Sequence, residues 1–240
     1  MSNGNGFQRL EIVGTTHVDR ASIARVRDTI DRIHPSVVAI ELCEERLWAI
    51  GDPTRGKLSS PTGMGLLPWL IALLEKTVGD VTEVFPGTEM MEAVDAARNA
   101  GSRVFLIDKP IRQILNDIRR VPFLEKLRIG ADVVIALFAV QTKCRGSEIL
   151  KPTFEQLMTE FEKKYPTLSR ILVDDRDRYM ADRLQEILNS TSGRVVAIVG
   201  FGHVRGISRI LRPVEKGVPA KEEGLRYDWT IEGFSAGTSL

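Results

Sequence analysis

Two of the three histidines in the chain follow the same pattern, an apolar run, a glycine, two residues and then the histidine. The first run spans residues 10–17 and ends at His17, and the second spans residues 194–203 and ends at His203. Apolar, β-branched runs that stop at a glycine predict buried strands. Because ligands of an open parallel sheet bind beyond the carboxyl ends of its strands, both histidines can face one crevice.

Carboxylates stand at the ends of two further apolar runs, Glu41 in the first and Asp108 in the second. An ionised carboxylate is costly to bury without a partner. Arg176 and Asp177 lie at the start of a helix with an apolar face, so one of them is expected to point inward. An inward arginine requires an anionic partner, which a strand-end carboxylate can supply.

Histidines and carboxylates at one sheet edge suit metal binding or acid–base chemistry. Imidazole and carboxylate bind Mn, Co, Zn or Fe, and a set of the two histidines with one carboxylate, Glu41 or Asp108, leaves positions open for water. Such an ion can lower the pKa of bound water from about 15.7 to about 7. Without an ion, His17 or Glu41 could act as a general base, an effect of about 100- to 10,000-fold.

The alternative for each histidine is a hydrogen-bonded residue of a strand-to-helix turn. The repeated pattern favours a functional site, whereas His34, at a helix end before Pro35, is interpreted as structural. Residues 51–58 lack the Ser or Thr of a P-loop, and in residues 200–206 the third glycine is one place late for a dinucleotide turn. We therefore expect no nucleotide cofactor.

The order of elements predicts one α/β domain over residues 1–240, with a mostly parallel central sheet flanked by helices. Helical insertions are expected after the second and third strands. Residues 1–6 are polar and glycine-rich, which predicts a flexible N-terminus. Residues 51–80 combine chain breakers with an apolar stretch, which leaves open a core helix, a lid or an interaction insertion. An additional edge strand is expected at residues 226–231.

Composition narrows the class of partners. The 33 basic and 32 acidic residues nearly cancel, so no overall field attracts nucleic acid. Cys43 and Cys144 form no disulfide framework, which favours a reducing, cytoplasmic compartment. The most apolar stretch, residues 66–74, is shorter than the roughly 20 residues of a membrane span.

These motifs resemble those of the TraB/PrgY pheromone-shutdown family, within the superfamily of the TIKI proteases and erythromycin-esterase-like proteins. The resemblance rests on five stretches in one order along nearly the whole chain: residues 14–17, 35–46, 86–90, 175–181 and 199–206. It implies a metal-dependent peptidase or hydrolase in which His17, His203 and Glu41 form the site and Arg176 is an accessory charge. Further residues carried into the site are Gly14, Glu44, Arg46, Glu89, Asp108, Asp177, Tyr179 and Gly200.

The chain departs from the family pattern at two points. Asp175 stands where a Glu is expected, and many prokaryotic relatives continue into a C-terminal membrane region, whereas this sequence ends at Leu240. The resemblance therefore implies a truncated soluble domain, cytoplasmic or at the cytoplasmic face of a membrane, with membrane association in a full-length form and homodimerisation left open.

We expect a hydrolase that acts on a peptide or a related amide or ester, with Arg176 stabilising the developing oxyanion. Two rival interpretations remain. One is a non-catalytic protein that sequesters a peptide in the same crevice, and the other is a membrane-associated adaptor that uses the apolar segment.

Overall fold

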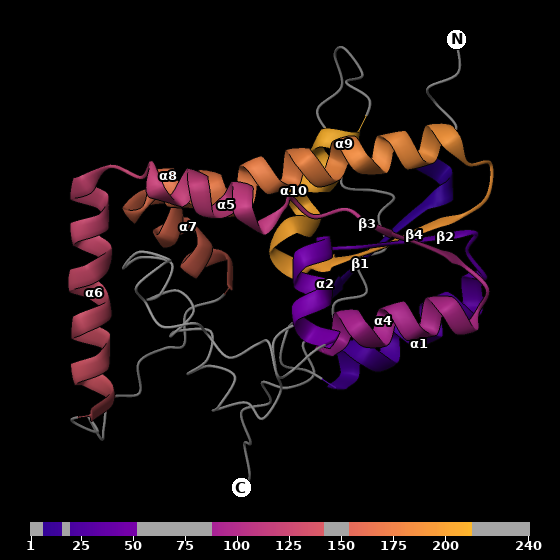
Figure 1. The fold of residues 1–240 in the computed structure, drawn as a ribbon, viewed down its shortest axis with the longest axis horizontal. Helices are drawn as coiled ribbons and strands as arrows, with labels where there is room; N and C mark the ends of the chain where they lie inside the picture. The colour runs from indigo at the N-terminus through magenta and orange to yellow at the C-terminus, as the bar shows by residue number, and fades with distance from the viewer. Residues whose placement is uncertain (1–6, 16–19, 52–87, 142–153, 213–240) are drawn as a thin grey trace, which may run out of the picture.

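The structure is a computed structural model that describes residues 7–15, 20–51, 88–141 and 154–212. In this part of the chain, four parallel strands form one sheet in the order β1-β4-β2-β3. The strands are β1 (Leu10–Thr15), β2 (Val37–Ile40), β3 (Arg103–Leu106) and β4 (Val195–Gly200). The predicted α/β class and parallel sheet are confirmed, and β4 inserts between β1 and β2 (Figure 1).

Helices follow each strand and cover the sheet on both faces (Figure 1). A 3₁₀ turn (Phe7–Arg9) precedes β1, and the helices are α1 (Arg20–Ile33), α2 (Glu44–Gly51), α4 (Thr88–Asn99), α5 (Ile111–Arg119), α6 (Phe123–Gln141), α7 (Phe154–Lys164), α8 (Pro166–Ser169), α9 (Asp175–Ser190) and α10 (Phe201–Leu211). A π-helical turn (Arg170–Asp174) joins α8 to α9. Helices α5 to α8 form the described part of the insertion that was predicted between the third and fourth strands.

Alternate residues of the central strands supply two separate cores, as expected for a parallel sheet buried on both faces. Helices α9 and α10 cover one face, where Val37, Ala39, Val195 and Ala197 are buried with Met180, Leu184 and Ile207. On the other face, α1 and α4 pack against Val38, Ile40, Val196 and Ile198 through Val26, Ile30, Ala93 and Val94. The uniformly apolar sequences of β2 and β4 follow from this double burial.

A smaller third core lies in a helical extension at one side of the sheet (Figure 1). It is formed by α5, α6, α8 and the π turn, and its buried apolar residues are Ile114, Ile118, Val121, Ile129, Leu168 and Ile171. At the start of α6, Phe123, Leu124 and Leu127 remain exposed. The extension therefore buries only part of the apolar surface of its helices.

Two contacts tie the two ends of the described chain together. Arg9 donates hydrogen bonds to the carbonyl oxygens of Leu188 at 3.0 Å and Thr191 at 2.5 Å, near the end of α9. A Cβ atom at Gly14 would lie 3.0 Å from Cγ2 of Val204. Glycine at this position therefore allows α10 to pack closely on β1.

Several predictions fall outside the described residues, including the flexible tip 1–6, the edge strand 226–231, nearly all of the insertion 51–80, and Cys144. Cys43 is described; it is buried, and this burial raises the pKa of its thiol. No helix in the described ranges has the length and apolar character needed to cross a membrane.

Candidate active site

The carboxyl edge of the sheet collects charged side chains from four elements. Glu41 follows β2 directly, Asp108 comes two residues after β3, and His203 lies in the first turn of α10 after β4. Arg176 and Asp177 lie in the first turn of α9, which packs across this edge against α10. The prediction that one of the two points inward is confirmed, and in fact both do: Asp177 is buried, and the Arg176 side chain is only 12% exposed.

The guanidinium of Arg176 holds the cluster together. Nε and Nη2 donate to the two carboxylate oxygens of Asp108, each at 2.9 Å, and Nη2 also donates to Oε1 of Glu41 at 2.5 Å. Nη1 donates to the carbonyl oxygen of Leu172 at 3.2 Å and to Nε2 of His203 at 3.0 Å. These five contacts match the five N–H donors of an arginine, so every donor has a protein acceptor.

Glu41 is buried and remains ionised through its partners. Oε2 accepts the backbone N–H of Gly200 at 2.5 Å, at the start of α10, where a negative charge is favourable. Burial acts to raise the pKa of the carboxyl group, but His203 when its ring is protonated, the charge of Arg176 and the hydrogen bond from Gly200 outweigh it and hold the pKa below its ordinary value. In turn, the negative charges of Asp108 and Glu41 raise the pKa of Arg176 against the effect of burial, so the guanidinium stays charged.

Asp108 is the most enclosed carboxylate of the cluster, with no exposed side-chain surface. Besides Arg176, its Oδ1 accepts the backbone N–H of Lys109 at 2.7 Å. Arg46, from α2, approaches Oδ2 at 3.6 Å and keeps a third of its side chain exposed. Arg46 is therefore a cation at the border of the cluster, whereas Arg176 lies inside it.

His203 is fixed from both ring nitrogens. Its Nδ1 lies 2.6 Å from Oδ1 of Asp177, and its Nε2 lies 3.4 Å from Oε1 of Glu41. Burial raises the pKa of Asp177 above its ordinary value, although the hydrogen bond with His203 acts in the opposite direction. A histidine held at Nδ1 by a carboxylate presents Nε2 in a defined direction, as hydrolytic bases and metal-binding histidines do.

The remaining predicted residues divide into three groups. Gly14 and Gly200 serve the packing and the start of α10, Arg46 borders the cluster, and Glu44 is exposed. Tyr179 is half-buried on α9, but no described contact joins it to the cluster. His17 and the side chain of Glu89 lie outside the described residues, so the structure brings together Glu41, Asp108, Arg176, Asp177 and His203.

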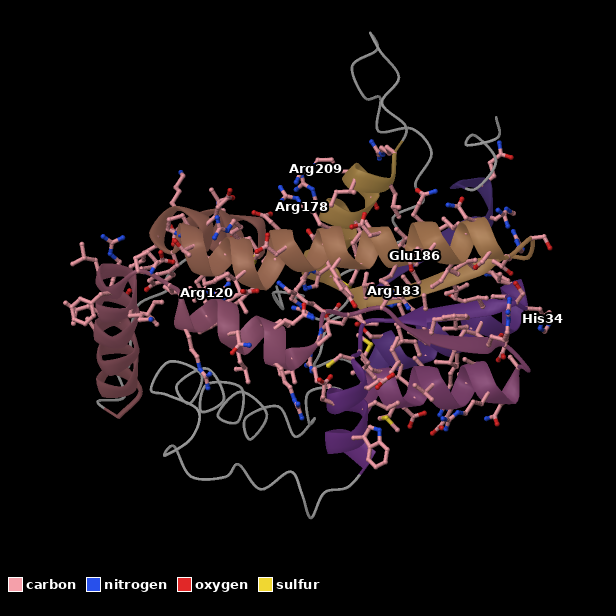
Figure 2. All side chains as sticks on the ribbon, turned by 45° about the horizontal axis from the view of Figure 1, so that its top comes forward. His34, Arg120, Arg178, Arg183, Glu186 and Arg209 are labelled. Atoms are coloured by element: carbon pink, nitrogen blue, oxygen red, sulfur yellow. The ribbon has the colours of Figure 1, made fainter. Side chains whose placement is uncertain are left out.

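His34, which was interpreted as structural from the sequence, and several charged side chains on the surface of α9 lie away from the cluster. His34 ends α1 with a φ of 47° before Pro35, at the opposite edge of the sheet (Figure 2). On the outer side of α9, Arg183 pairs with Glu186 at 2.6 Å, and Arg178 approaches Asp175 at 3.9 Å. These charged side chains thus pair with one another along the surface of α9.

Two contributions to the site were not singled out in the sequence. The Leu172 carbonyl accepts from Arg176 within the π turn, and apolar periodicity carries no signal for such a turn. Gly206 lies against the carboxylate of Asp177, and a Cβ atom at this position would lie 1.7 Å from Oδ2. The feature of the sequence that could have identified Gly206 is its three-residue spacing from His203, which puts both residues on one face of α10.

The described residues supply two of the three expected metal ligands. The distance of 3.4 Å between Nε2 of His203 and Oε1 of Glu41 matches two ligands of a tetrahedral ion bound at about 2.0–2.1 Å. Both atoms also contact Arg176, so an ion bound by them would replace these contacts. No group of three or more His, Cys, Asp or Glu suited to a metal occurs within the described residues, and the third expected ligand, His17, lies outside them.

Comparisons with known proteins identify relatives of this chain. The chain is 31% identical over 227 residues to the uncharacterized protein MJ1365 of Methanocaldococcus jannaschii, covering 89% of this chain and 56% of that protein. It is 27% identical over 237 residues to a TraB domain-containing protein of Homo sapiens, covering 84% of this chain and 62% of that protein.

The chain thus spans less than two thirds of the length of these relatives. The sequence profile of the TraB/PrgY/gumN family matches residues 3–217, a range that contains every residue of the cluster. The chain therefore belongs to the TraB/PrgY/gumN family.

Proposed function

We propose that the protein is a hydrolase that acts on a peptide or a related amide or ester bond at the carboxyl edge of the sheet. The observation that supports the proposal is the geometry of His203, which Asp177 holds at Nδ1 while Nε2 lies 3.4 Å from Glu41. An oriented imidazole beside a carboxylate is suited to remove a proton from water.

In this proposal, a water molecule replaces the N–H of Arg176 at Nε2 of His203, and Nε2 accepts a proton from this water as its oxygen attacks the carbonyl carbon of the substrate. The resulting tetrahedral intermediate then releases the amine or alcohol, which takes up the proton held on His203. General base catalysis of this kind contributes about 100- to 10,000-fold. Glu41 lies close enough to orient the same water, and His17 is proposed to complete the site.

A divalent ion bound by His17, Glu41 and His203 would lower the pKa of the attacking water and polarise the carbonyl group. Mn, Co, Zn and Fe all accept this set of ligands. His203 would then serve as a ligand, and its bond to Asp177 would orient it for that role as it would for a base.

The contacts of Arg176 assign it a different task from the expected stabilisation of an oxyanion. All five of its donors are already bonded within the protein, so it is proposed to position Glu41, Asp108 and His203. The side chain of Arg46 forms a 3.6 Å ion pair with Asp108, its charge also lowers the pKa of Glu41, and it is partly exposed. It is therefore the better candidate for the charge that stabilises an oxyanion.

The test is hydrolysis of a library of synthetic peptides and chromogenic esters, followed by mass spectrometry, with and without added Mn, Co, Zn or Fe. His203→Ala is expected to lower turnover by about 100- to 10,000-fold. His34→Asn is the matched control, because asparagine tolerates the positive φ of this helix end and the residue lies at the other edge of the sheet. Full turnover by His203→Ala would overturn the proposal.

A non-catalytic peptide-binding protein is the second candidate, and the complete pairing of Arg176 favours it. A cluster whose charges already satisfy one another can stabilise a crevice without reacting. The same library distinguishes the two functions. A peptide retained in stoichiometric amount and recovered unchanged after prolonged incubation with each metal would support binding and contradict hydrolysis.

A further inference from the structure

The carboxylate of Asp177 occupies the space that a side chain on α10 would otherwise fill. Oδ1 of Asp177 contacts His203, and the other side of the carboxylate lies over Gly206. A Cβ atom on Gly206 would be 1.7 Å from Oδ2, 2.6 Å from Cγ and 3.3 Å from Cβ of Asp177. Any residue other than glycine would therefore have to move this carboxylate.

We propose that Gly206 and Asp177 act together as positioning residues that lock His203 in the tautomer with its hydrogen on Nδ1. Gly206 leaves the space in which Asp177 lies, and Asp177 accepts the Nδ1–H bond. The catalytic consequence rests on the proposed hydrolase function, because that function needs Nε2 without a hydrogen. The tautomer itself does not depend on any activity.

Two neighbours select this tautomer, and the second, Arg176, acts only while Asp177 holds the ring in this orientation. Asp177 can only accept at Nδ1 when it is ionised, and the contact is short at 2.6 Å. At the other nitrogen, Arg176 can only donate, and its Nη1 lies 3.0 Å from Nε2. The hydrogen therefore belongs on Nδ1 and the lone pair on Nε2, where it accepts from Arg176.

The contact with Gly206 leaves the carboxylate little freedom to adapt. Asp177 is buried, and rotation away from a new methyl group would break its bond to His203. A Gly206→Ala protein should consequently lose the effect of Asp177 although no atom of Asp177 or His203 has been removed. This predicts that substitutions at Gly206 and Asp177 produce the same defect rather than two separate ones.

The experiment is a double-mutant cycle of Gly206→Ala and Asp177→Ala, read by ¹⁵N NMR of the His203 ring and by turnover of a cleaved peptide. The unsubstituted protein should show the Nδ1–H tautomer. In each single variant, the Nδ1–H tautomer should no longer dominate, and turnover should fall about 10- to 100-fold, the range for residues that orient a functional histidine. Adding Gly206→Ala to Asp177→Ala should change neither readout further.

Gly130→Ala is the matched control, because the same change on α6 meets no atom within 4 Å. It should leave both readouts unchanged. If Gly206→Ala does not fold, the double variant should fold again, since the carboxylate has been removed. A retained Nδ1–H tautomer in Gly206→Ala, multiplied effects in the double variant, or a double variant that stays unfolded would each overturn the proposal.

The NMR readout separates this inference from the hydrolase proposal. A protein that hydrolyses nothing in the library but loses the Nδ1–H tautomer on Gly206→Ala would support the positioning pair and contradict the hydrolase. An active protein whose tautomer is unchanged by Gly206→Ala would support the hydrolase proposal and contradict the positioning pair.

Discussion

At the scale of single residues, the cluster at the sheet edge is an arrangement of buried charges that depend on one another. Arg176 is the cation that faces both Glu41 and Asp108 most directly, and each of these carboxylates is buried. Removing one member of such a group leaves an uncompensated charge in a low-dielectric environment, which costs more than the intact pair contributes. The cluster is therefore expected to affect folding as well as function.

Arg176→Ala is predicted to lower the free energy of unfolding by about 3–5 kcal/mol, because Glu41 and Asp108 would lose their shared counter-charge. Arg176→Lys should recover little of this loss, since an ammonium group cannot replace the two-oxygen contact with Asp108. Denaturant unfolding measures both changes.

The control for this prediction is Arg178→Ala, two residues further along α9. Its partner Asp175 is 3.9 Å away and its side chain is 70% exposed, so the change should stay within about 0.5 kcal/mol. Equal losses for the two alanine variants would show that Arg176 is no more than a surface charge of this helix.

At the scale of the elements, the site depends on how closely α10 approaches β1. Gly14 lies in β1 and faces Val204, which follows His203 in α10. A change at this contact moves the helix that carries His203. The position of the imidazole is thus set in part by a strand that contributes no described polar group to the cluster.

Gly14→Ala is predicted to destabilise the fold by about 1–3 kcal/mol, because the new methyl group would lie 3.0 Å from Cγ2 of Val204. Val204→Ala removes the Cγ2 atom that the new methyl group would meet, so the double variant should be more stable than the sum of the two single effects predicts. Thermal and denaturant unfolding of all four proteins measure the coupling. Strict additivity would mean that the two residues do not limit the approach of α10.

Sequence periodicity was sufficient to predict the elements but not their spatial order. The apolar runs that end at Gly14, Glu41, Asp108 and Gly200 identified the strands and the sheet edge at which the charged cluster lies, because burial on both faces requires uninterrupted apolar residues. The insertion of β4 between β1 and β2 could not be predicted, since parallel strands of similar composition can pair in several orders. His17 remains a prediction.

The simultaneous inward placement of Arg176 and Asp177 was also beyond the sequence. Neighbouring residues of a regular helix point about 100° apart, so the helical pattern indicated one inward residue. Both residues can point inward because other elements lie on two sides of the start of α9. Arg176 turns toward the ends of β2 and β3, while Asp177 turns toward α10. Such contacts between distant segments leave no periodic signal.

At the scale of the whole molecule, the described chain consists of a sheet with two large cores and a helical extension with a smaller one. The strands β2 and β4 are buried throughout, whereas the start of α6 exposes Phe123, Leu124 and Leu127. Regions with less buried apolar surface open at a lower free energy.

Hydrogen exchange followed by mass spectrometry should therefore show slowest exchange in β2 and β4 and faster exchange in α5 and the first turns of α6. Ile118→Ala, in the extension, should accelerate exchange in α5 and α6 while the protection of β4 changes little. Uniform acceleration across the sheet and the extension would show instead that all three cores open as one cooperative unit.

The pairing of β1 with β4 has a consequence for the synthesis of the protein. Leu10 lies beside Val195, so β1, the first of the described strands to be synthesised, finds its neighbour only after nearly the whole described chain has been made. Until then, β1 has no partner within the sheet, and β2 also lacks β4. A chain released before residue 195 would expose two apolar strands and lack His203, so translation must pass both β4 and the start of α10 before sheet closure and site assembly can occur.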